Sequence, residues 1–170
     1  MSSNRKLFAA FALLALGGCG FTPLYGGDLG QSTSARLDMV AVQNIPERTG
    51  QMLRISLETH LHADGAPTAE VYALNVAYVI NTTAIGIQQD SSATRNRMNA
   101  VATWSLTPIG NPGKPLMTGT ATAQDAANII DQQYFALNLE TDTVNQQLAD
   151  DIAAEITSQL AAWFRAHPNA

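Results

Sequence analysis

The sequence of 170 residues has one cysteine, three histidines and few charges, since charged residues make up only 14% of the chain. A single cysteine cannot form a disulfide within the chain. His60 and His62, two apart on a predicted helix, point in different directions and cannot share a metal as residues three or four apart can. The chain also lacks a G-x-S-x-G nucleophile motif and a glycine-rich phosphate loop. These absences predict no metal, no cofactor and no assembled active site.

The chain has no apolar run long enough to span a bilayer, and its longest apolar run lies near the N-terminus. Arg5 and Lys6 precede an uninterrupted apolar stretch from Leu7 to Leu16. The stretch is well short of the ~20 residues that span a bilayer as a helix, so it is typical of a secretory signal. We therefore expect residues 1–18 to be a signal peptide that is cleaved.

The lone cysteine follows directly on this signal, in Leu16-Gly17-Gly18-Cys19. This arrangement resembles the lipobox of bacterial lipoproteins, in which the cysteine sulfur receives a diacylglycerol before cleavage. On this interpretation Cys19 becomes an acylated N-terminus that anchors the protein in a membrane. The absence of an acidic residue at Gly20 and Phe21 favours sorting to the outer membrane of a Gram-negative cell. The alternative is a plain signal peptide with a chance cysteine.

The chain after Cys19 is the size of one domain, and its charge is unevenly distributed. Removal of Arg5 and Lys6 leaves seven cations against fourteen acids, a net charge of −7 that argues against general nucleic-acid binding. Only residues 85–124 are net positive, with Arg95, Arg97 and Lys114 against one aspartate. We expect a lipidated tether over residues 19–35 and a single domain over residues 36–170.

Hydrophobic periodicity predicts six elements in this domain. Alternation indicates strands over 36–45, 70–87, 97–106 and 116–123, whereas stripes of apolar residues indicate a helix from Pro46 to about residue 64 and a helix of ~26 residues after residue 138. Residues 124–137 give mixed signals. The order predicts an α+β two-layer sandwich, in which two helices pack on one face of a four-stranded, mostly antiparallel sheet. The other face would be partly open and would carry Thr103, Ser105, Thr118, Thr120 and Thr122.

Two motifs resemble the lipopolysaccharide-assembly lipoprotein family LptE, particularly its alphaproteobacterial members. One is the start Cys19-Gly20-Phe21-Thr22-Pro23-Leu24-Tyr25-Gly26, and the other is Arg48-x-Gly50-Gln51-x-Leu53-Arg54-x-x-Leu57 in the first predicted helix. The resemblance implies a non-enzymatic component of the outer-membrane lipopolysaccharide translocon. Such a protein occupies the lumen of the LptD β-barrel, supports its assembly and binds lipopolysaccharide.

Lipopolysaccharide carries phosphates, and arginine is well suited to forked contacts with phosphate oxygens. Arg95 and Arg97 share one side of a predicted strand, and Lys114 joins them if its loop lies at the same end of the sheet. We predict that these three residues bind lipopolysaccharide. The alternative is a solvated strand edge whose charges limit aggregation.

Two other functions agree with an anchored α+β domain. One is an auxiliary lipoprotein of a lipid-trafficking ABC transporter, which would contact an inner-membrane partner. The other is an anchored enzyme, which the inventory of side chains argues against.

Overall fold

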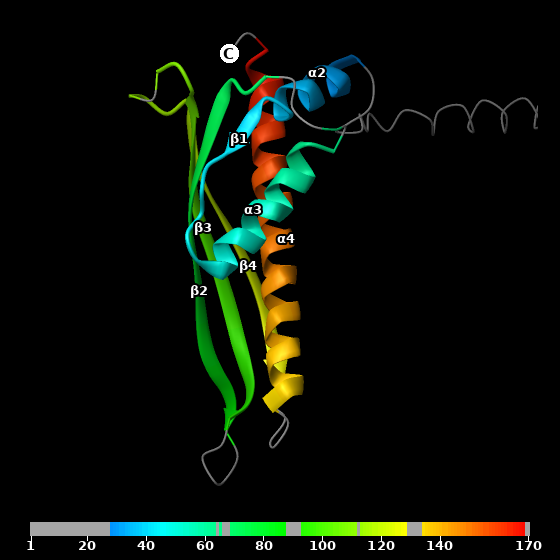
Figure 1. Cartoon of the computed structure of the whole chain (residues 1–170), viewed down its shortest axis with the longest axis vertical. Helices are drawn as coiled ribbons and strands as arrows, with labels where there is room; N and C mark the ends of the chain where they lie inside the picture. Colours follow the sequence, from blue (N-terminus) through cyan, green and yellow to red (C-terminus); the bar gives the residue numbers. More distant parts are fainter. Residues whose placement is uncertain are drawn as a thin grey trace, which may run out of the picture.

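A long, curved sheet covered by helices on one side forms the protein (Figure 1). The computed structural model describes residues 28–63, 65, 69–87, 93–111, 113–128 and 134–168. In chain order the elements are α2 (Asp28–Leu37), β1 (Val40–Val42), α3 (Glu47–Leu61), β2 (Tyr72–Ile87), β3 (Ala93–Pro108), β4 (Met117–Asn128) and α4 (Tyr134–Ala166). The predicted α+β sandwich is confirmed.

The four strands lie in the order β1-β2-β3-β4. β1 pairs with β2 in parallel, which requires the crossover that α3 supplies, and β2, β3 and β4 form an antiparallel meander. The predicted four-stranded, mostly antiparallel sheet is therefore confirmed. The predicted polar turn between β2 and β3 lies outside the described residues. Because β2 and β3 each have 16 residues, the sheet is about 50 Å long at ~3.3 Å per residue.

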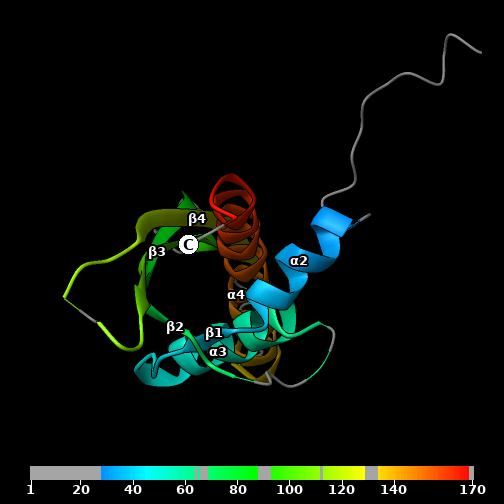
Figure 2. The same cartoon turned by 90° about the horizontal axis from the view of Figure 1, so that it is seen from above.

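Alternation along the strands divides the sheet into an inner and an outer face. Trp104, Leu74 and Leu106 lie fully buried on the inner face, and small alanines such as Ala102 let the helices approach closely. Figure 2 shows the strands arranged as an arc around α4. The core thus lies between the concave inner face and the helices.

α4 runs the whole length of the sheet (Figure 1). Its 33 residues span about 50 Å at 1.5 Å per residue. The predicted stripe is buried, with Leu148, Ile152, Ile156 and Leu160 fully inaccessible. The helix is longer than the predicted ~26 residues because it begins at Tyr134, inside the stretch that received no assignment.

α3 begins and ends close to its predicted limits. Pro46 precedes the first turn, and Glu47 supplies the first-turn carboxylate that suits the positive end of a helix dipole. Gly50 is required by close packing, since an added Cβ would lie 2.7 Å from Cγ2 of Ile45. Leu53 and Leu57 are fully buried against the core.

α2 was not predicted, and the strand expected over residues 36–45 is wrong in its first part. Arg36 and Leu37 belong to α2, and β1 is limited to Val40–Val42. The physical reason is tertiary: Leu37 is buried in the core, and the Arg36 guanidinium lies 4.8 Å from the centre of the Phe164 ring. The helix starts at Asp28, within the region we expected to be a tether.

Candidate binding surface on the open face of the sheet

The described helices all lie on the inner side of the sheet (Figure 2), so no helix of the described residues covers the outer face, which we call the open face. As predicted, it presents a ladder of small hydroxyl side chains: Thr103, Thr118, Thr120 and Thr122 are exposed and Ser105 is half-buried. Register sets them in rows, with Thr103 opposite Thr120 and Ser105 opposite Thr118. This middle part of the open face is uncharged and rich in groups that can donate and accept hydrogen bonds.

Toward the start of β3, beyond Thr122 on β4, amide side chains replace the hydroxyl side chains on the open face. Asn99 lies between Asn81 on β2 and Gln124 on β4, and the Gln124 Nε2 group donates a hydrogen bond of 2.8 Å to Asn99 Oδ1. The amide row separates the threonine ladder from a cationic end.

Arg95 and Arg97 form that cationic end. They are two residues apart and lie on the same face of β3, so their Cα atoms are about 6.6 Å apart. Both side chains are exposed, and they line a depression of about 280 Å³ together with Ile85, Gln124, Asp125 and Ala126. The structure therefore brings the two predicted arginines into one concave site, formed by all three strands of the meander.

The two arginines have no partner among the described residues, in contrast to several other cations. Arg48 pairs with Asp142 at 2.8 Å, and Arg54 pairs with Glu58 at 2.8 Å. Asp125 lines the cationic depression, but its Oδ1 atom accepts a hydrogen bond of 2.7 Å from the Ala126 N–H group. Two guanidinium groups against one carboxylate leave the depression net positive.

Lys114 does not belong to this site. It lies in the loop between β3 and β4, which is at the end of the sheet opposite to the start of β3 (Figure 1). Thirteen residue-to-residue steps lead from Arg95 to Pro108, and they separate the two ends by about 43 Å along β3. The condition on which Lys114 was grouped with the arginines is not met. The lipidation candidate Cys19 lies outside the described residues.

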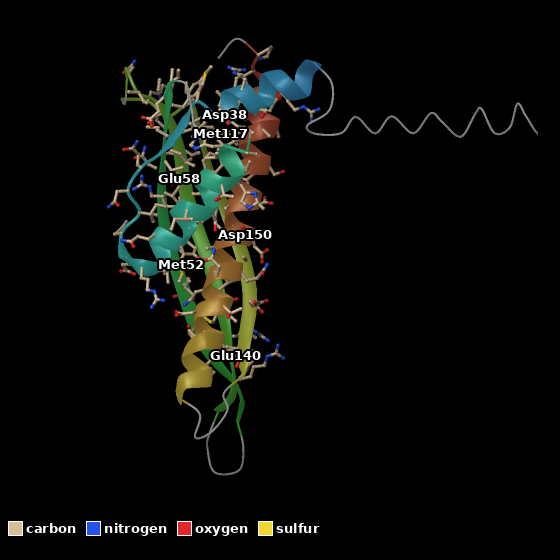
Figure 3. The ribbon with its side chains drawn as sticks, turned by 45° about the vertical axis from the view of Figure 1, so that its right-hand side comes forward. Asp38, Met52, Glu58, Met117, Glu140 and Asp150 are labelled. Carbon is tan, nitrogen blue, oxygen red and sulfur yellow. The ribbon has the colours of Figure 1, made fainter. Side chains whose placement is uncertain are left out.

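The helix side of the molecule has a different character. A shallow groove of about 530 Å³ between α3 and α4 is lined by Met52, Asp142, Thr143, Gln146, Gln147 and Asp150, and Figure 3 shows Met52 and Asp150 on the two helices. The His60 Nε2 atom lies 3.0 Å from Asp150 Oδ1, whereas His62 Nε2 lies 3.1 Å from the Val40 carbonyl oxygen. The two histidines thus serve separate structural contacts. Within the described residues, no three His, Cys, Asp or Glu side chains gather as metal ligands would.

Another hollow, of about 350 Å³, lies beside β2 where β1 has ended. Tyr78, Glu47 and Asn145 are among its lining residues. The Tyr78 hydroxyl and Asn145 Oδ1 are buried there and have no hydrogen-bond partner among the described residues. Burial raises the pKa of Tyr78 to about 12, because the phenolate is poorly solvated.

Part of the cationic site was not predicted from the sequence. Gln124 and Asp125 fell in the stretch without an assignment, although β4 continues to Asn128. The signal was present, since the polar phase of Thr118, Thr120 and Thr122 extends to Gln124. The neighbour from β2, Ile85, could not be found without the register.

Comparison with solved structures defines the class of the fold. A lipoprotein of Caulobacter crescentus superposes with a TM-score of 0.65 at 19% identity, covering 78% of this chain and 96% of that one. The minor lipoprotein of Acinetobacter baumannii gives 0.58 at 19% identity over 73% and 91% of the two chains, and rare lipoprotein B of Shewanella oneidensis gives 0.56 at 9% identity over 76% and 97%. The protein therefore has the fold of these bacterial lipoproteins.

The family follows from the sequence. The LptE family model, which describes lipopolysaccharide assembly, matches residues 36–160. The chain belongs to the LptE family, and the resemblance stated above is confirmed. No curated protein sequence matches the chain. Of the helices in the described part of the protein, none combines the length and apolarity needed to span a bilayer.

Proposed function

We propose that this protein is a non-enzymatic, lipid-anchored subunit of the outer-membrane lipopolysaccharide translocon. It is held on the periplasmic side of the outer membrane of a Gram-negative cell by acyl chains on Cys19. It occupies the lumen of an LptD-like β-barrel, assists assembly of that barrel, and binds lipopolysaccharide on its open face. Membership of the LptE family supports the role in lipopolysaccharide assembly, and the open face supports the manner of binding.

The observation that carries this proposal is the pair of unpartnered arginines in the depression at the end of the open face. Arg95 and Arg97 are exposed, and neither is engaged by a carboxylate of the described residues. A guanidinium group can donate two parallel hydrogen bonds to a phosphate, which a solvated lysine does not match in geometry. Two such groups on one strand face, with their Cα atoms about 6.6 Å apart, suit a ligand that carries more than one phosphate.

The middle of the open face suits a protein that is enclosed by a barrel. The lumen of an outer-membrane barrel is polar. The desolvation free energy of Thr103, Thr120 and Thr122 on contact with the lumen would be small, because their hydroxyl groups can form hydrogen bonds with the barrel side chains. No charged group has to be desolvated in this part of the face. A strongly charged face would carry a larger desolvation penalty.

A binding experiment with purified lipopolysaccharide tests the ligand. The acylated protein, solubilised in detergent, is compared with the double variant Arg95→Ala, Arg97→Ala. Loss of charge-assisted hydrogen bonds should weaken binding by about tenfold or more. The control is the double variant Arg48→Ala, Arg54→Ala, which removes the same charge from α3 and should change binding less than about twofold.

Thermal unfolding by circular dichroism accompanies each variant to show that its fold is intact. If both double variants weaken binding equally, non-specific charge explains the affinity and the site proposal is wrong. If neither changes it, lipopolysaccharide does not bind at the arginines.

Affinity purification from detergent-solubilised envelopes tests the partner. A heat-modifiable β-barrel protein in stoichiometric amount supports the proposed lumen position. Recovery of a permease or an ATP-binding subunit in its place would instead indicate an auxiliary lipoprotein of a lipid-trafficking ABC transporter.

A further inference from the structure

Four large apolar side chains are exposed at one end of the sheet, the end opposite to Arg95 and Arg97. Their exposed fractions are 36% for Met39, 42% for Val71, 47% for Ile109 and 39% for Leu116. Each comes from a different segment, just before β1, just before β2, just after β3 and just before β4. We call these four residues the apolar row.

Backbone hydrogen bonds show that the members of the apolar row are neighbours. The Val71 N–H group donates to the Met39 carbonyl at 2.9 Å, and the Ile109 N–H group donates to the Val71 carbonyl at 3.0 Å. Leu116 is tied to the same end, since its N–H group donates to the Leu106 carbonyl at 2.8 Å. Met39, Val71 and Ile109 thus lie side by side on segments ~4.8 Å apart, and Leu116 lies beside β3 near Leu106, three residues before Ile109.

The alternation of the strands places the apolar row on the open face. Tyr72 and Met117 face the core, so Val71 and Leu116, one residue before each, belong to the outer side. The row therefore continues the open face beyond the threonine ladder, and the face changes from apolar at one end, through uncharged polar, to cationic at the other.

The apolar row lies at the end of the molecule to which the chain from Cys19 leads. α2 contacts the C-terminal end of α4, because the Arg36 Nη1 group donates hydrogen bonds to the Phe164 and His167 carbonyls at 3.2 and 2.8 Å. Figure 3 places Asp38, which follows α2, and Met117 at this end, and Glu140 at the other. Nine peptide units separate Cys19 from Asp28, and fully extended they span at most about 30 Å. That reach is shorter than the ~50 Å sheet, so an anchor at Cys19 keeps this end next to the membrane.

Lys114 completes the surface. It is exposed in the same loop as Ile109 and Leu116, two residues before Leu116. An ammonium group beside exposed apolar side chains is the arrangement of a membrane interface, where the charge meets lipid phosphates and the apolar groups enter between the headgroups.

We propose that the apolar row and Lys114 rest on the headgroup layer of the phospholipid leaflet that holds the anchor. This inference rests on the proposed acylation of Cys19. It gives the protein a fixed orientation at the mouth of the proposed barrel: the apolar row contacts the lipid of the anchoring leaflet, and the sheet runs from there along the lumen, with Arg95 and Arg97 farthest from that leaflet. The acyl chains supply most of the affinity, and the row supplies the orientation.

Depth-dependent quenching of tryptophan fluorescence tests the contact. The acylated mature protein, which begins at Cys19, is reconstituted into vesicles of phosphatidylcholine and phosphatidylglycerol, in which the phosphatidylcholine carries bromine close to the glycerol. Leu116→Trp reports on the apolar row. Val79→Trp is the matched control, since Val79 is also exposed on β2 but lies eight residues, about 26 Å, from Val71. Unsubstituted protein gives the background of its own two tryptophans.

Brominated lipid should quench the tryptophan at position 116 at least twofold more than the tryptophan at position 79. A second reporter, Ile109→Trp, should behave as position 116 does, and serves if the first variant does not fold. Equal quenching at the apolar row and at position 79 overturns the inference while leaving the anchor intact. Failure of the protein to float with vesicles, or a mass without acyl chains, overturns the anchor and with it this contact. Lipopolysaccharide binding in detergent is measured separately and is unaffected by either result.

Discussion

Among the described glycines, Gly119 is the one at which an added methyl group would come closest to neighbouring atoms. It lies on the inner face of β4 and is paired with Trp104 across the sheet. An added Cβ would lie 2.5 Å from Trp104 Cζ2, 2.7 Å from Trp104 Cε2 and 2.9 Å from Gln159 Oε1. Carbon atoms in contact prefer ~3.5–4.0 Å, so the indole must move by about 1 Å.

The indole has little freedom to move, because Trp104 is buried among the sheet and α4. The strain of Gly119→Ala is that of an overpacked core, about 1–3 kcal/mol, and the smaller backbone entropy of alanine in the unfolded chain offsets only about 0.4–1 kcal/mol of it. We expect a net loss of about 1–2 kcal/mol in the free energy of unfolding. For a domain of this size, that loss lowers Tm by roughly 2–8 °C.

The assay is thermal unfolding followed by near-ultraviolet circular dichroism, which also reports on the environment of the indole. Gly110→Ala is the control, since nothing lies within 4 Å of the Cβ that it adds, and it should shift Tm by no more than about 2 °C. Trp104→Phe should cost much less in the Gly119→Ala background than alone, because the smaller ring relieves the clash. A Gly119→Ala protein as stable as Gly110→Ala would refute the packing described for this part of the sheet.

The remaining predictions concern α3 and the hollow beside β2. Tyr78 keeps its proton more tightly in the folded protein, with a pKa of about 12 against an ordinary value of 10.0, so stability should be constant below pH 10 and fall as the pH rises from 10 to 12. Because the side chain is partly exposed, the loss in the free energy of unfolding should be about 1 kcal/mol. Urea unfolding at pH 7–12 measures it, and Tyr78→Phe should abolish the fall. The same pH dependence in Tyr78→Phe would show that Tyr78 is not its cause. In the α3 motif from Arg48 to Leu57, Leu57→Ala should lower the free energy of unfolding by about 2–5 kcal/mol in chemical unfolding, because Leu57 is fully buried. Arg48→Ala should lower it by less than about 1 kcal/mol, because the ion pair of Arg48 with Asp142 is exposed. Equal losses of stability would contradict the assignment of this motif to core packing.

Periodicity predicted those elements whose burial depends on one clear face. The spacing of Leu53, Leu57 and Leu61 gave the limits of α3 to within a few residues, and the alternation from Tyr72 onward gave β2. Both patterns are local consequences of a side chain facing the core. The same is true of the threonines of the open face, because alternation along each strand predicts their outward orientation without the register.

Elements that are stabilised by distant contacts were not predicted. The sequence of α2 contains two serines, one threonine and one glycine, which have low helix propensity. The helix is held by Leu37 in the core and by contacts of Arg36 with the end of α4. The Arg36 contacts are not visible from local pattern, since their partners are more than a hundred residues away. The strand expected around Arg36 was an error of this kind.

The candidate site shows the same division. Two residues on one strand face share a surface, so Arg95 and Arg97 were correctly grouped. Lys114 was grouped with the arginines on the condition that its loop lies at the same end of the sheet. The predicted meander already places that loop at the opposite end, because successive turns between antiparallel strands lie at alternate ends of a sheet. The concave shape that Ile85 and Gln124 give to the site depends on register and could not be read from the chain.

The central claim is that lipopolysaccharide binds at the cationic end of the open face. Photocrosslinking in living cells tests it most directly, with a photoreactive amino acid in place of Thr83, which is exposed on β2 opposite Arg97. The control carries the same amino acid in place of Ala154, which is exposed on α4. We expect an adduct that carries lipopolysaccharide from position 83 and none from position 154. An adduct from position 154 alone, or equal adducts from both positions, would contradict it.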